Sequence, residues 1–274
     1  HRAADRETLE DFFEVCIRYT RMHNPDRVIK CVDGDYDAPP RHGMLDQHAY
    51  VCWHEDHGLE LGKMHKGELF DVKRGWFCGV GEYGAEGLEP LETMRRHYPA
   101  SYLPENDDDP TWTPDRIPKC QAWGWHHQWF DQPETIKGWV EATHAFQAWA
   151  VRFMHEAWRR RVDVINSTTL HLLINAYPNN WLKALCSVDR EPLPAFFALA
   201  DANTPLAVNL RTDRYALTSG DETDIELWLL NDTPHRPRDL RVVYRIEVAG
   251  ETSLISGCAV GVDPVSSAFQ GTLA

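Results

Sequence analysis

The stretch from Trp76 to Gly87 restricts the possible folds of this chain more than any other part of the sequence. A short apolar run leads into Glu82, which is flanked by glycines and followed by Tyr83 and Gly84. This pattern is typical of a carboxylate at the end of a buried strand, because glycines leave room for a ligand or another backbone beside it. Two interpretations fit the pattern: a dinucleotide-binding loop, and a catalytic carboxylate of a barrel that cleaves sugars.

The dinucleotide interpretation rests on Gly79, Gly81 and Gly84, whose spacing matches the G-x-G-x-x-G fingerprint. That fingerprint requires a helix that opens at the third glycine, a second strand soon afterwards, and an acidic residue about 20 positions on. A helical pattern near 88–98 does follow, but it leads into prolines and the acidic loop 105–110. Because no apolar strand returns, we expect no βαβ unit here, and the catalytic interpretation is favoured.

The charge and the cysteine content disfavour several classes of protein. A formal net charge of -14 disfavours nucleic-acid and anionic-membrane partners, since both repel an acidic surface. No apolar run approaches the roughly 18 residues that a membrane-spanning helix needs. The seven cysteines are widely spaced and include no C-x-x-C pair, which indicates reduced thiols and a cytoplasmic location.

Up to about residue 204 the chain alternates helical and strand patterns. Apolar residues at helical spacing from Leu9 to Tyr19 predict one helix, and Pro133 opens a long amphipathic one. Strands are expected at the short apolar runs 28–32, 45–52, 76–81 and 170–174. Strands that alternate with helices indicate an α/β architecture.

After Pro205 the pattern changes to period two. Ile225, Leu227 and Leu229 alternate with Glu226 and Trp228, and the apolar residues of 240–248 alternate with Arg241, Arg245 and Glu247. Short alternating segments separated by turn residues predict the antiparallel strands of a β-sandwich. We therefore divide the chain into an α/β domain over 1–204 and a β-sandwich domain over 205–274, which we expect to be truncated.

Three segments carry polar and aromatic residues in a recognisable order. They are Asp46-Gln47-His48-Ala49-Tyr50, Gly81-Glu82-Tyr83-Gly84 and Ile174-Asn175-Ala176-Tyr177-Pro178. With their surroundings they resemble the C-terminal half of the catalytic barrel of glycoside hydrolase family 2, which includes β-galactosidases, β-glucuronidases, β-mannosidases and exo-β-glucosaminidases. The resemblance covers residues 1 to about 204. It implies a partial (β/α)8 TIM barrel followed by an incomplete immunoglobulin-like β-sandwich.

The resemblance also implies a retaining exo-acting β-glycosidase, in which two carboxylates ~5–5.5 Å apart act as nucleophile and acid/base. Glu82 matches the family's nucleophile, and Tyr50 matches a tyrosine whose hydroxyl steadies that carboxylate. Both stand at the C-terminal ends of expected strands, where barrel enzymes place catalytic groups. The residues expected to contact the sugar are Asp46, His48, Asn175, Tyr177 and Trp181.

Three of these residues also have a purely structural interpretation. Glu82 fits a solvated loop carboxylate, Tyr50 a core tyrosine, and His48 a buried histidine with satisfied hydrogen bonds. Glu86 is interpreted as a structural or helix-opening acid rather than as the catalytic partner. Family members often place a tryptophan on the last barrel strand, whereas Leu172 or a neighbour stands there in this chain. Tyr177 and Trp181 in the loop beyond are the alternative source of an aromatic face, although a tryptophan is more often a core or rim residue.

The partner acid is missing from the sequence. The family's acid/base glutamate follows an asparagine, and no Asn-Glu dipeptide occurs in this chain. By the resemblance that glutamate falls upstream of His1, and the chain shows roughly four of the eight strands of a closed barrel. We therefore expect a fragment that is inactive by itself.

The remaining motifs indicate no metal and no cofactor. His54-Glu55-Asp56-His57 is not H-E-x-x-H, because only two residues separate its histidines, and no G-x-S-x-G occurs. The expected partner is a β-linked glycoside, and the longer protein is expected to be a homo-oligomer, as family members often are. The alternative is a non-catalytic carbohydrate-binding or scaffold protein with a degenerate barrel.

Overall fold

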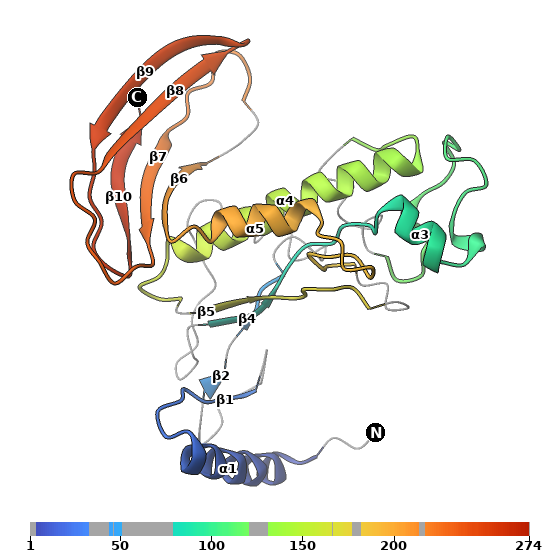
Figure 1. Cartoon of the computed structure of the whole chain (residues 1–274), viewed down its shortest axis with the longest axis horizontal. Coiled ribbons are helices and arrows are strands. Elements are labelled where there is room, and N and C mark those ends of the chain that lie inside the picture. Colours follow the sequence, from blue (N-terminus) through green and yellow to red (C-terminus); the bar gives the residue numbers. More distant parts are fainter. Residues whose placement is uncertain are drawn as a thin grey trace.

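The computed structural model describes residues 4–32, 44–45, 47–50, 79–120, 131–165, 167–176, 182–213 and 217–273. Its helices and 3-10 turns are α1 (Arg6–His23), α3 (Leu91–His97), η2 (Ala100–Tyr102), η3 (Pro114–Arg116), α4 (Ile136–Arg159) and α5 (Pro194–Ala202). Its strands are β1 (Lys30–Val32), β2 (Met44–Leu45), β3 (Gln47–His48), β4 (Gly79–Tyr83), β5 (Ser167–Leu170), β6 (Leu206–Thr212), β7 (Ile225–Asn231), β8 (Arg241–Val248), β9 (Glu251–Ala259) and β10 (Ser266–Leu273). Parallel strands with helices come first, and antiparallel strands follow (Figure 1).

The sheet that carries the candidate site consists of β3, β4 and β5, all parallel. β4 lies in the middle, and its register places Glu82 opposite His48 of β3 and Tyr83 opposite Leu170 of β5. β1 and β2 form a separate parallel pair. Parallel neighbours require long crossover connections, which agrees with the helix and strand alternation predicted from the sequence.

The long helix α4 packs against this sheet (Figure 1). It begins after Thr135, whose hydroxyl accepts a hydrogen bond of 3.0 Å from the Gly138 amide and so satisfies one of the free N–H groups of the first turn. The residues that form the core between α4 and β4 include Val80, Tyr83, Phe146, Phe153, Met154 and Trp158. The predicted helix after Pro133 is thus confirmed, as is the one predicted near the start of the chain, which is α1.

The segment between β4 and α4 forms a second apolar core around Trp139 of α4, with Trp112 and Ile117 fully buried. The helix predicted near 88–98 is confirmed as the shorter α3, which begins after Pro90. Proline fits this position because it lacks an N–H group and its φ is already fixed. Through this apolar core, α3 and the loop after β4 pack against one end of α4.

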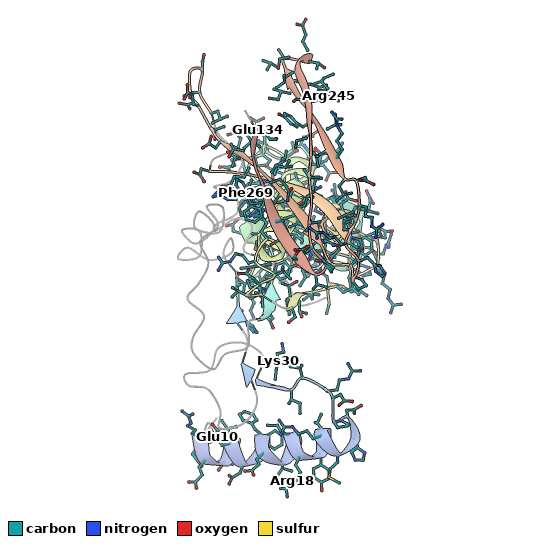
Figure 2. All side chains as sticks on the ribbon, turned by 90° about the vertical axis from the view of Figure 1, so that its left-hand side faces the viewer. Glu10, Arg18, Lys30, Glu134, Arg245 and Phe269 are labelled. Carbon is teal, nitrogen blue, oxygen red and sulfur yellow. The ribbon has the colours of Figure 1, made fainter. Side chains whose placement is uncertain are left out.

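The antiparallel strands form a three-stranded sheet, in the order β10-β7-β6, and a β8–β9 hairpin. The central strand β7 buries Leu227 and Leu229, whereas Phe269 of β10 is 52% exposed. Figure 2 labels Phe269 on this sheet. The antiparallel strands predicted from the period-two alternation are therefore confirmed in β7 and β8. In both views α1 lies at the end of the molecule opposite this hairpin. Among the described segments, no helix has the length and apolar character to cross a membrane.

The strand predicted at 170–174 is displaced in the structure. β5 runs from Ser167 to Leu170, because its β-branched threonines favour a strand although they are polar and fall outside the apolar run. The apolar residues that follow do not continue the ladder with β4. Instead, the carbonyls of Leu172 and Leu173 accept hydrogen bonds of 3.0 and 2.9 Å from the amides of 185 and 186 downstream.

Candidate active site

Glu82 emerges at the C-terminal end of the central parallel strand. The other four residues of β4 are buried, whereas the Glu82 side chain remains 26% exposed. Its carbonyl accepts a hydrogen bond of 2.8 Å from the amide of Ala49, which continues the pairing of β3 beyond His48. The backbone therefore fixes Glu82 beside the segment that carries Tyr50, and its carboxylate still reaches solvent.

Two predicted site residues contact the carboxylate of Glu82. The hydroxyl of Tyr50 donates a short hydrogen bond to Oε2 of Glu82, and Nδ1 of His48 lies 3.5 Å from the same oxygen. The rings of His48 and Tyr50 meet edge to face, with centroids 6.3 Å apart. Hydrogen bonds to a carboxylate stabilise its ionised form, which is the form that a nucleophile or a base requires.

Lys183 is a charged neighbour that the sequence analysis did not identify. Its side chain is buried, and its Nζ lies 4.4 Å from the centroid of the Tyr50 ring. Burial lowers the pKa of Lys183 to about 8, while the carboxylates of Glu82 and Glu86 act in the opposite direction. A cation is therefore held beside the carboxylate and over the face of the tyrosine that bonds it. The sequence signal that could have identified Lys183 as a buried charged residue is its position inside the apolar run 181–186.

His171 approaches the site from the residue after β5. Its amide donates a hydrogen bond of 2.9 Å to the carbonyl of Tyr83. Burial lowers the pKa of the His171 imidazole, the Glu82 carboxylate raises it, and Lys183 lowers it again. The His171 imidazole thus senses the charges at Glu82 and Lys183.

The glycine fingerprint has a packing explanation here. A Cβ atom added to Gly84 would lie 2.8 Å from the carbonyl oxygen of His171, so the two backbones approach too closely for any side chain. No helix opens at the third glycine, since α3 begins only at Leu91. The third glycine of the spacing that resembles a dinucleotide fingerprint therefore reflects contact between the segments that follow β4 and β5.

A single side chain of α4 fastens these two segments together. The Gln147 amide nitrogen donates hydrogen bonds of 3.0 Å to the carbonyls of Ala85 and of Ala184. Gln147 is fully buried, and the amide of Gly87 adds a bond of 2.8 Å to the carbonyl of Leu182. Because Ala184 follows Lys183 directly, this amide also sets the position of the lysine relative to the end of β4.

Asn175, predicted to contact the sugar, lies in a buried polar network. Its Nδ2 donates a hydrogen bond of 2.6 Å to Oε1 of Glu89, and its Oδ1 accepts one of 3.3 Å from the amide of Ala184. Burial raises the pKa of Glu89 to about 7, against the hydrogen bonds from Asn175 and the Val188 amide. These contacts hold the segment after β5 in place, and the sugar-binding role of Asn175 stays a prediction.

The other predicted sugar contacts, Asp46, Tyr177 and Trp181, lie outside the described residues. Glu86, interpreted from the sequence as a structural or helix-opening acid, is fully buried. It does not open a helix, since α3 begins at Leu91, and its Oε1 accepts a hydrogen bond of 3.4 Å from the Leu182 amide. Within the described part of the chain, no three His, Cys, Asp or Glu side chains are grouped to hold a metal ion.

Solved structures that resemble this chain are glycoside hydrolases, so the predicted resemblance to family 2 is confirmed at the level of the fold. The β-D-mannosidase of Dictyoglomus thermophilum matches with a TM-score of 0.53 and 15% identity over 83% of this chain. The exo-chitosanase of Amycolatopsis orientalis matches with a TM-score of 0.51 and 16% identity over 77% of this chain.

The chain spans only 26% of the length of each of these two structures. Another structure of the exo-chitosanase, a variant in complex with PNP-β-D-glucosamine, matches over 87% of this chain and 27% of its own length, with a TM-score of 0.53 and 15% identity. No family model and no curated protein matches the chain.

Proposed function

We propose that this chain is part of a retaining, exo-acting β-glycosidase that hydrolyses O-glycosidic bonds, with Glu82 as its nucleophile. The observation that carries the proposal is the hydrogen bond from the Tyr50 hydroxyl to Oε2 of Glu82 at the C-terminal end of parallel strands. Barrel enzymes place their catalytic groups at this end of the strands. The fold shared with a β-mannosidase and an exo-chitosanase supports the same class of reaction.

The proposed domain organisation follows from the same likeness. Residues 1–204 represent the C-terminal half of a TIM barrel, and residues 205–274 an incomplete immunoglobulin-like β-sandwich. The parallel order β3-β4-β5 with α4 packed against it supports the first assignment. The antiparallel sheet of β6, β7 and β10 with the β8–β9 hairpin supports the second.

In the proposed reaction the ionised carboxylate of Glu82 attacks the anomeric carbon of the sugar. A second carboxylic acid donates its proton to the departing glycosidic oxygen, and the same group later takes a proton from the water that hydrolyses the glycosyl-enzyme. The longer protein supplies this acid from a segment upstream of the chain, so the chain alone is inactive. Tyr50 and His48 hold the carboxylate of Glu82 between turnovers, and the Lys183 cation balances its charge.

The proposed substrate is a β-linked glycoside bound at its non-reducing end. The side chains proposed to line the sugar are Asp46, His48, Asn175, Tyr177 and Trp181, with the two aromatic rings as a stacking face. The cytoplasmic location and the homo-oligomeric state of the longer protein stay predictions.

The proposal is tested on the chain joined to the upstream barrel strands. A panel of 2-deoxy-2-fluoro β-glycosides traps the glycosyl-enzyme of a retaining enzyme, and mass spectrometry of the digested protein locates the label. We expect the label on Glu82, and no label in the Glu82→Gln variant, whose amide oxygen still accepts from Tyr50. Glu92→Gln, the same change at an exposed position of α3, should label normally.

A label on another carboxylate would reject Glu82 as the nucleophile. No label with any sugar, in a protein that is folded and binds sugars, would instead favour a non-catalytic carbohydrate-binding or scaffold protein with a degenerate barrel. The sugar that reacts identifies the substrate class.

A further inference from the structure

Tyr83 follows Glu82 in β4 and faces the opposite side of the sheet, since neighbouring side chains of a strand alternate. It is almost completely buried in the core beneath α4. Its hydroxyl lies 2.9 Å from Nδ1 of His155 in α4, and the two rings are nearly parallel with centroids 6.2 Å apart. The strand residue next to the proposed nucleophile is therefore attached to one histidine of the covering helix.

The second ring nitrogen of His155 continues the connection. Its Nε2 lies 3.0 Å from Oδ1 of Asn203, the residue at the end of α5. The Asn203 amide nitrogen donates a hydrogen bond of 3.0 Å to the carbonyl of Leu199, which fixes the orientation of that amide. Because Oδ1 only accepts, Nε2 of His155 must carry the proton, Nδ1 must accept, and the Tyr83 hydroxyl must donate.

Asn203 belongs to the junction 202–205 between α5 and β6. Arg159, one turn beyond His155 in α4, donates to the carbonyls of Ala202 and Thr204, the latter at 2.9 Å. The Arg159 guanidinium also lies 2.9 Å from the carboxylate of Asp232, the residue after β7. The last turns of α4 therefore hold the start of the antiparallel part of the chain.

We propose that His155 is a positioning residue for Glu82. Through its hydrogen bond with the Tyr83 hydroxyl, His155 couples the position of the junction 202–205 to the strand that carries the nucleophile. The inference rests on the proposed function of Glu82. It assigns the junction that leads into the β-sandwich part a role in the active site: through Asn203 the junction holds His155 in one tautomer, and His155 in turn holds β4. An uncharged imidazole is required, since a proton on Nδ1 would remove the acceptor for the Tyr83 hydroxyl.

The groups that face His155 favour this uncharged form. Burial lowers the pKa of His155 to about 4, and the guanidinium of Arg159 acts in the same direction. The hydrogen bond to Asn203 and the carboxylate of Asp232 oppose this shift. Tyr83, the facing residue of β4, stays a neutral phenol because its own burial raises its pKa. The coupling is therefore intact at neutral pH.

The first measurement is the tautomer of His155 in the unmodified chain, read from the 15N chemical shifts of its imidazole by NMR. We expect a protonated Nε2 and an unprotonated Nδ1 at pH 7. A protonated Nδ1, or rapid exchange between the tautomers, would overturn the proposal without any variant.

The second measurement is the pKa of His171, which the Glu82 carboxylate raises, and which therefore reports how close that carboxylate lies. Glu82→Gln should lower the pKa of His171, and the size of this decrease is the largest change that a displacement of the Glu82 carboxylate can produce. His155→Phe keeps a stacked ring but loses both hydrogen bonds, and Tyr83→Phe removes the hydroxyl, which bonds Thr168 of β5 as well as His155. We expect both variants to shift the pKa of His171 downward, by less than Glu82→Gln does.

The matched control is Met154→Leu, a conservative change at a fully buried neighbour of His155 in the same core. It should leave the pKa of His171 unchanged. If folded His155→Phe or Tyr83→Phe leaves that pKa unchanged as well, His155 is only a packing residue and the proposal is wrong. Should His155→Phe fail to fold, Tyr83→Phe decides. This readout requires no catalysis, so its failure is separate from a failure to trap a glycosyl-enzyme on Glu82.

Discussion

The Tyr50 hydroxyl donates a hydrogen bond to Oε2 of Glu82 from the segment that continues the neighbouring parallel strand. His48 approaches the same oxygen from the strand itself. The two residues alternate around Ala49, so the backbone of one short segment places both against one carboxylate. This relationship makes the contribution of the hydroxyl measurable.

Tyr50→Phe removes the hydroxyl and retains the ring. A hydrogen bond to a charged group contributes about 1.5–3 kcal/mol, so we expect the rate of Glu82 labelling by fluoro-glycosides in the extended protein to fall about 10- to 100-fold. Tyr244→Phe on β8 makes the same chemical change away from the site and should label at the original rate. Equal rates for Tyr50→Phe and the unmodified protein would mean that the hydroxyl does not assist the carboxylate.

Lys183→Met removes the buried cation but keeps most of its apolar stem. Lys183 lowers the pKa of His171, beside the larger effects of burial and Glu82, so we expect this substitution to raise the pKa of His171. The pKa is measured by NMR titration of the folded chain. Lys183→Arg keeps the charge and should change it little, and Lys137→Met on the exposed face of α4 should not change it. An unchanged pKa in Lys183→Met would place the cation too far from the site to act on it.

The contact of Tyr50 with Glu82 could be predicted because the resemblance to family 2 implies it, and the expected strand ends agree with it. The apolar run at 76–81 indicates the central strand β4, and parallel strands bring their C-terminal ends to one edge of the sheet. The hydrogen bonds of the covering helix could not be predicted in the same way. Tyr83 and His155 lie 72 positions apart, and no periodicity in the sequence relates them.

Buried polar groups account for most of what the sequence analysis missed. Lys183 stands in an apolar run, where its charge was the only signal, and its neighbours Glu82 and Tyr50 come from β4 and from the segment after β3. Asn175 was assigned to the sugar, yet its amide bonds Glu89, which is 86 positions away. Such partners are set by tertiary packing, because a buried polar atom has to find an acceptor or donor wherever the fold supplies one.

The stability of the chain should depend on the protonation of His155. Its pKa is about 4 in the folded state, against an ordinary value of 6.5, so the unfolded chain binds more protons between these values. The stabilisation is therefore complete above pH 6.5 and is lost as the pH falls through 4, by up to about 3 kcal/mol. Urea unfolding at pH 7 and pH 4.5 measures this.

His155→Phe should remove this contribution and flatten the acid side of the profile relative to the unmodified chain. His235→Gln, at an exposed position after β7, should leave the profile as it is. A profile for His155→Phe that runs parallel to that of the unmodified chain would show that His155 titrates alike in both states.

Glu89 should produce the opposite dependence on pH. Its pKa is about 7 in the folded state, against an ordinary value of 4.5, because burial favours the neutral acid. Its contribution to stability is therefore fully present below pH 4.5 and is lost as the pH rises through 7, by up to about 3 kcal/mol.

Glu89→Gln stays neutral and keeps an oxygen for the Asn175 amide, so it should be more stable than the unmodified chain at pH 8, with a smaller difference at pH 5. Glu105→Gln, an exposed acid in the loop after α3, should show no such pH-dependent gain. If Glu89→Gln instead gains equally at both values of pH, Glu89 is not the group that titrates.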